Sequence, residues 1–109
     1  MDETEFEARA DETLAAIERA LEASAAPVDL ELKPGGVLEL GFEDNSKMVI
    51  NRHRVAREIW VAARSGGFHF RWDGSVWRDT RGGEELFAAL SKLVSAQGGV
   101  AVVLAPRAG

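Results

Sequence analysis

Five acidic residues near the start of the chain have the spacing of one charged helix face. They fall within an arc of roughly 100° if each residue turns the helix by about 100°: Glu3, Glu7, Asp11, Glu18 and Glu22. Like charges one turn apart destabilise a helix by ~0.2–0.5 kcal/mol per pair, so stacking them indicates a surface with another role. Carboxylate oxygens bind hard metal cations and attract basic protein surfaces. The plainer alternative is a solvated face that aids solubility.

The helix that would carry these carboxylates extends from residue 3 to about residue 24. Pro27 ends it, because the residue before a proline is pushed out of the α region. A flanking apolar stripe has the spacing of a face that packs on a core: Phe6, Ala10, Leu14, Ile17 and Leu21.

Charge is divided unevenly along the chain. Residues 1–31 hold ten acidic and two basic residues, a balance of −8, whereas residues 32–109 hold eight acidic and eleven basic residues, a balance of +3. The protein is therefore expected to have an acidic side and a mildly basic remainder.

Length and composition predict one folded domain. The chain has 109 residues and is 46% apolar, which is enough for one core. We assign residues 1–105 to the domain and 106–109 to a frayed tail. No apolar run approaches the ~20 residues of a membrane span, and the start is acidic rather than a signal peptide, so a cytoplasmic protein is expected. The absence of cysteine excludes thiol catalysis, thiolate zinc sites and a thiolate-held iron–sulfur cluster within this chain.

Apolar and polar residues alternate with a period of two after the first helix, which predicts a run of short strands. Inward positions include Val28, Leu30 and Leu32 on the first strand, and Ile59 and Val61 flank an outward Trp60 on the fourth. Short turns between successive strands imply an antiparallel meander.

A second amphipathic helix follows Gly82-Gly83 and ends at Gly98-Gly99. Residues 100–104 are expected to add a short extended segment. Only one sheet face is apolar throughout, so the fold class is α+β, with both helices packed on that face of the sheet.

The outward face of the predicted sheet carries Asn51, Trp60 and His69 on successive strands. An exposed tryptophan with an amide and an imidazole beside it is typical of an interaction surface. A scattered exposed aromatic without a function is the alternative.

These residues lie in a series of short motifs that resembles the bacterial frataxin (CyaY) family. The motifs occur in order over essentially the whole domain: Glu5-Phe6, Ala10-Asp11, Ile17-Glu18, Gly35-Gly36-Val37-Leu38, Asn45-Ser46-Lys47, Asn51-Arg52, Ile59-Trp60-Val61-Ala62, Gly66-Gly67-Phe68-His69-Phe70, Trp77 and Gly83-Glu84. The order of helix, strands and helix is also that of the frataxin α/β sandwich.

The resemblance implies a weak iron-binding accessory or regulatory protein of iron–sulfur cluster assembly, which docks on a cysteine desulfurase and on the scaffold protein. It implies iron, as Fe²⁺ or Fe³⁺, on an acidic ridge of the first helix and first strand: Glu3, Glu7, Asp11, Glu18, Glu22, Asp29 and Glu31. It implies partner contacts at Glu18, Glu22, Asn51, Arg52, Trp60 and His69. The protein is expected to be mostly monomeric, with iron-induced oligomers as a further expectation.

The sequence departs from the family pattern in two regions. Residues 23–27 lack the acidic residues usual at the end of the helix, and Arg19 interrupts the ridge. The family's Asn-Arg-Gln-x-Pro stretch is Asn51-Arg52-His53-Arg54-Val55 here, and a glutamine usual before the tryptophan is Glu58. The loop after the third strand is therefore more basic than usual.

Other function classes have less support. No Ser/His/Asp arrangement, Gly-rich phosphate loop or His-x-x-x-His pair is found, and ferroxidase activity would need a fixed metal site that the sequence does not display. Nucleic-acid binding by an open sheet with aromatics is opposed by the net charge of −5. A generic acidic interaction module without physiological iron binding is the alternative that stays open.

Overall fold

The computed structural model describes residues 1–106. Two helices flank a run of six strands in the order expected from the sequence. The elements are α1 (Glu3–Ala23), β1 (Val28–Lys33), β2 (Val37–Phe42), β3 (Lys47–His53), β4 (Glu58–Ala63), β5 (Gly66–Trp72), β6 (Trp77–Asp79) and α2 (Leu86–Gly98).

Helix α1 has side-chain caps at both ends. The Asp2 carboxylate accepts a hydrogen bond from the Glu5 backbone N–H at 2.8 Å, which satisfies one of the free donors of the first turn. At the other end the Ser24 hydroxyl donates to the Leu21 carbonyl at 2.8 Å. The predicted apolar stripe is buried along the whole helix.

The six strands form one antiparallel sheet in sequence order, β1-β2-β3-β4-β5-β6. Each connection is short enough for a hairpin, which is why neighbours in sequence are neighbours in space. In the turn between β5 and β6, the Asp73 carboxylate accepts hydrogen bonds from the Ser75 and Val76 backbone N–H groups, both at 2.8 Å. These bonds, with the Arg78 guanidinium, lower the pKa of Asp73 to about 2.

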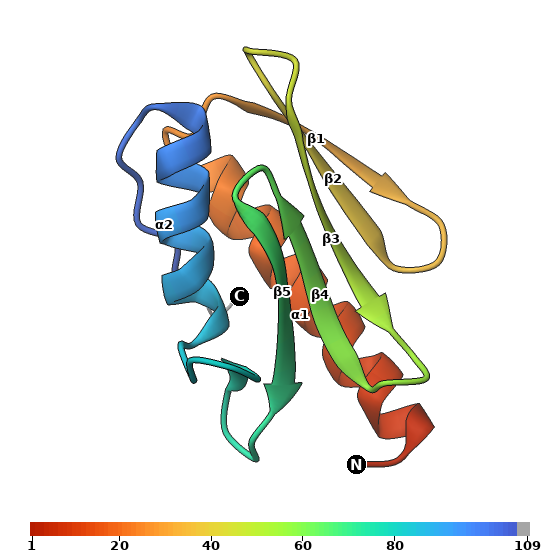
Figure 1. The fold of residues 1–109 in the computed structure, drawn as a ribbon. Coiled ribbons are helices and arrows are strands. Elements are labelled where there is room, and N and C mark those ends of the chain that lie inside the picture. The colour runs from red at the N-terminus through yellow and green to blue at the C-terminus, as the bar shows by residue number, and fades with distance from the viewer. Residues whose placement is uncertain (107–109) are drawn as a thin grey trace.

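The core lies between the inward face of the sheet and both helices. Leu38, Ile50 and Phe70 from the strands are fully buried and belong to one cluster with residues of α1 and α2. Both helices therefore cover the same sheet face, and α1 crosses behind the strands in Figure 1. Trp77 on β6 extends this contact, since its indole N–H donates to the Thr13 hydroxyl of α1 at 2.9 Å.

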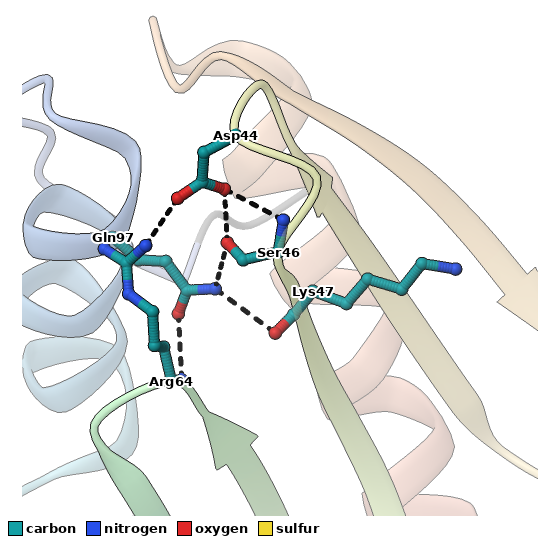
Figure 2. Close-up of polar contacts among 5 residues, drawn as sticks. All are labelled: Asp44, Ser46, Lys47, Arg64 and Gln97. Carbon is teal, nitrogen blue, oxygen red and sulfur yellow. Dashed lines mark hydrogen bonds and ion pairs between the residues drawn. The ribbon is translucent and has the colours of Figure 1, made fainter.

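The end of α2 is attached to two turns of the sheet through one buried side chain. Gln97 is 8% exposed, and its amide oxygen accepts from the Arg64 backbone N–H at 3.1 Å. Its amide nitrogen donates to the Ser46 hydroxyl at 2.9 Å and to the Lys47 carbonyl at 3.2 Å (Figure 2). The Asp44 carboxylate accepts from Ser46 and pairs with Arg64, so the β2–β3 and β4–β5 turns are fixed to the same helix end.

The margins of the fold are less covered than its centre. Leu32 is on the same sheet face as Leu38, as predicted, but it is 58% exposed because it lies near the end of edge strand β1 and outside the core cluster. Residues 100–104 join no strand of the sheet. The Val102 and Leu104 backbone N–H groups donate to the hydroxyls of Ser95 and Ser91 on α2, at 2.9 and 2.8 Å. Of the predicted frayed tail, residues 107–109 lie outside the described residues.

Candidate functional site

The predicted acidic face lies on the solvent side of α1. Glu3, Asp11 and Glu22 are exposed, and Glu7 and Glu18 are half-buried, beside the buried apolar stripe. The first strand continues this acidic surface in sequence, with Asp29 and Glu31 exposed.

Two arginines neutralise the N-terminal half of this face. Arg52 on β3 forms an ion pair with Asp11, and Arg54 in the following loop places its Nη1 3.5 Å from carboxylate oxygens of both Glu3 and Glu7. These contacts offset the repulsion between carboxylates that the sequence places one turn apart.

The position of the Arg52 side chain depends on Gly36, in the turn between β1 and β2. A Cβ atom at Gly36 would lie 2.6–2.7 Å from the Arg52 side chain, and Gly36 has a φ of +76°, in the region that glycine tolerates best. Space and backbone conformation therefore both require a glycine here.

The C-terminal half of the acidic surface is different. Within residues 1–106, Glu18, Glu22, Asp29 and Glu31 make no ion pair with a basic side chain. Nor do three acidic, histidine or cysteine side chains converge anywhere in those residues as a preformed metal cluster. A cation held by these carboxylates would keep several water ligands, because no closed cage of protein oxygens surrounds it.

The outer face of the sheet brings Asn51, Trp60 and His69 side by side, in the predicted register. Asn51 pairs with Trp60 across β3 and β4, and Trp60 pairs with His69 across β4 and β5. Trp60 is half-buried although no helix covers this face. Its ring lies between two imidazoles, His53 at 3.8 Å and His69 at 4.3 Å between ring centroids, with interplanar angles of 15° and 7°. We call His53, Trp60 and His69 the aromatic stack.

A buried carboxylate lies next to the aromatic stack. Glu58 is 5% exposed and accepts hydrogen bonds from the Trp60 indole N–H at 2.9 Å and from the Arg71 guanidinium at 2.6 Å. The His69 Nδ1 atom lies 3.6 Å from the same carboxylate. Burial alone would raise the pKa of Glu58, but the Trp60 hydrogen bond and Arg71 outweigh it and hold that pKa below its usual value.

Comparison with known proteins gives a consistent result across the chain. A family model described as a frataxin-like domain matches residues 1–100. The chain belongs to the frataxin family. It is 61% identical over 104 residues to the iron-sulfur cluster assembly protein CyaY of Dechloromonas aromatica, a match that covers 95% of this chain and 99% of that protein.

Solved frataxins have the same fold. Frataxin from Psychromonas ingrahamii superposes with a TM-score of 0.85 at 33% identity, covering 94% of this chain and 96% of that one. The trimeric frataxin of Saccharomyces cerevisiae, complexed with ferrous iron, superposes with a TM-score of 0.65 at 28% identity, covering 87% and 86%.

Sequence reasoning missed two members of the site in this frataxin. The sequence identified His53 and Glu58 only as departures from the family pattern. The strand register, in which His53 pairs with Glu58 and Glu58 with Arg71, is the signal that could have placed both on the outer face beside Trp60.

Proposed function

We propose that this frataxin is an iron-binding accessory protein of iron–sulfur cluster assembly, with no catalytic turnover of its own. The observation that carries the proposal is the 61% identity, over nearly the whole length of both chains, to a protein named for that process. The division between an acidic helix and an aromatic sheet face supports two separate contacts. The acidic face would dock on a basic surface of a cysteine desulfurase, and the face around Asn51 and Trp60 on the cluster scaffold. We also propose that this frataxin is cytoplasmic and mostly monomeric.

Iron is proposed to bind weakly at the unpaired carboxylates of the acidic surface. Glu18 and Glu22 lie one helical turn apart and can share a cation, and Asp29 and Glu31 on β1 offer oxygen ligands for further weak sites. Glu3, Glu7 and Asp11 belong to the same proposed ridge, but their arginine partners would have to be displaced first. The yeast frataxin complexed with ferrous iron supports iron as the metal.

The metal assignment is testable by NMR titration of the full chain with Fe²⁺ under anaerobic conditions. Paramagnetic broadening should begin at the C-terminal half of α1 and at β1, and reach the first two turns of α1 only at higher Fe²⁺. Glu18→Gln with Glu22→Gln should remove the early broadening, whereas Glu3→Gln with Glu7→Gln, the matched control, should leave it. Broadening centred on His53 and His69 would contradict the assignment.

The desulfurase contact is testable by charge reversal. Glu18→Lys with Glu22→Lys should weaken binding to purified cysteine desulfurase and reduce its salt dependence, because surface charges act by steering that salt screens beyond about 8–10 Å. Glu12→Lys with Glu43→Lys changes the net charge equally at two exposed positions outside the acidic face, and should have a much smaller effect.

The alternative, an acidic interaction module without physiological iron binding, predicts a different combination of results. Desulfurase binding would then respond to the Glu18 and Glu22 reversals, while cluster assembly rates with and without this protein would not depend on added iron.

A further inference from the structure

The segment after α2 turns back alongside that helix and is bonded to it through two serines (Figure 1). The Ser95 hydroxyl accepts a hydrogen bond from the Val102 N–H at 2.9 Å and donates to the Val102 carbonyl at 3.1 Å. The Ser91 hydroxyl contacts both backbone groups of Leu104 in the same way, at 2.8 and 3.3 Å. The two serines therefore take the place of a neighbouring strand, because they satisfy the backbone groups of every second residue.

The other edge of this segment is open. Val102 and Leu104 are buried, whereas Ala101, Val103 and Ala105 are exposed, an alternation typical of an extended chain. In an extended chain the backbone groups of successive residues point to opposite sides, so those of the three exposed residues point away from α2. Within residues 1–106, no hydrogen bond reaches them. We call residues 101, 103 and 105 the free edge. Such an edge is a template for pairing with another extended chain.

Two hollows border the free edge along α1. The first has a volume of about 160 Å³ and is lined by Ala20, Ala23, Ser24, Val103 and Ala105. The second has a volume of about 240 Å³, and its lining includes Ala16, one turn before Ala20, and Pro106, next to Ala105. The hollows therefore follow one another along the same side of α1. The small side chains of the first leave room for a backbone beside the free edge.

The second hollow has aromatic walls. Trp72 and Trp77 line it together with Phe87, and the rings of Trp72 and Trp77 meet edge to face at 5.5 Å between centroids. A cation already lies on this aromatic group, because the Arg9 guanidinium is 4.2 Å from the centroid of Trp72. Indole rings attract guanidinium and ammonium groups through their negative faces. These walls therefore suit a further basic side chain with an apolar stem.

The charge around the second hollow favours the same kind of group. Glu12 and Glu85 line it with Arg19, so two negative charges and one positive charge give a balance of −1. The Glu85 carboxylate also accepts hydrogen bonds from the first turn of α2. Glu12 is exposed and, within residues 1–106, makes no ion pair. Its carboxylate is therefore available to a cation that enters the hollow.

We infer that the free edge and the two hollows bind an extended segment of a partner protein that carries a lysine or arginine side chain. The main chain of that segment pairs with the free edge over the first hollow, and its basic side chain lies in the second, against the indoles and Glu12. A second copy of this segment fits less well, because residues 98–106 contain no basic side chain. The surface belongs to the helical layer, so it is separate from both contacts of the proposed function and does not depend on them.

The test is an NMR titration of the full chain with the blocked peptide acetyl-Val-Thr-Val-Thr-Val-Arg-amide, whose β-branched residues favour an extended conformation. Backbone amide signals of the free edge should shift together with the indole N–H of Trp77, which donates to Thr13 in the second hollow. The same peptide ending in glutamine should bind roughly three- to tenfold more weakly, because it lacks the cation. A peptide N-methylated at every valine and threonine cannot donate to the free edge and should not bind.

Protein variants test the charge contact from the other side. Glu12→Gln should weaken binding of the arginine peptide by roughly three- to tenfold and leave that of the glutamine peptide unchanged. Glu43→Gln is the matched control, since it removes an equal charge at an exposed position that lines neither hollow, and it should change neither affinity.

Several results would overturn the inference. One is the absence of shifts at the free edge with about 5 mM peptide, and another is equal binding of the N-methylated peptide. Equal affinity for the arginine and glutamine peptides, in the parent or relative to Glu12→Gln, would remove the basic side chain from the assignment. Self-association in sedimentation of the protein alone, with the same amide signals shifting as concentration rises, would show that a second copy takes the free edge. None of these results bears on the desulfurase or scaffold contacts.

Discussion

Substitution of Glu58 tests whether a buried carboxylate holds Trp60 in place. Glu58→Ala leaves the half-buried indole N–H without its 2.9 Å acceptor, which costs about 1–3 kcal/mol. The ion pair between Glu58 and Arg71 contributes less. Because the Arg71 side chain is 65% exposed, water solvates it when the pair is lost, and the cost is under ~1 kcal/mol. We therefore expect a decrease in the free energy of unfolding of about 2–3 kcal/mol.

Glu58→Gln is the matched control for this substitution. The glutamine oxygen can still accept from Trp60, so only the charge facing Arg71 and His69 is lost, and the expected cost is about 0.5 kcal/mol. Urea unfolding followed by circular dichroism measures both costs, and the indole N–H resonance of Trp60 should move in Glu58→Ala but little in Glu58→Gln.

The difference in folding stability between the parent protein and Glu58→Gln should depend on pH in a defined direction. The folded-state pKa of Glu58 is lowered, so its stabilising charge is fully present above the unfolded-state pKa of about 4.3 and is lost as the pH falls through the folded value. The stability difference between the parent and Glu58→Gln should therefore narrow below about pH 4. Equal costs for alanine and glutamine at neutral pH would refute the role given to the Trp60 hydrogen bond.

Three further substitutions address other contacts. Gln97→Ala removes three hydrogen bonds at a buried position and should cost about 2–3 kcal/mol, or roughly 10 °C in melting temperature, measured by thermal unfolding. Arg52→Gln frees Asp11 and should change stability by under ~1 kcal/mol, while Fe²⁺ broadening in NMR spreads toward the start of α1. Asp73→Ala should destabilise at neutral pH, and because the pKa of Asp73 is about 2, urea unfolding should show that difference shrinking only between about pH 4 and 2.

The alternation of apolar and polar residues along the strands was enough to predict most of the fold. Ile59 and Val61 are buried and Trp60 lies on the opposite face, because a period of two assigns each side chain to one face of a sheet. Short turns then fixed the meander and with it the register that aligns Asn51 with Trp60. At the margins of the sheet the sequence was less informative, because the pattern identifies Leu32 as an inward apolar side chain but does not show whether another element covers it.

The site was less predictable than the fold, for a related reason. The spacing of carboxylates on α1 is a property of one helix, but their arginine partners come from β3 and its loop, more than forty residues later. No local pattern reports that contact. Similarly, the departures Glu58 and His53 were visible in the sequence, but their shared environment follows only from pairing β3 with β4.

Three consecutive residues connect the two surfaces. The side chains of Arg52 and Arg54 contact carboxylates of α1, and that of His53, between them, stacks on Trp60 on the opposite side of the sheet. A substitution in this segment therefore perturbs the acidic face and the aromatic stack together, so a change in partner binding caused by it cannot be assigned to one surface. Glu22 and His69 lie outside the segment, each on one surface only. Substitutions at these two positions can separate a contact made by the acidic helix from one made by the sheet.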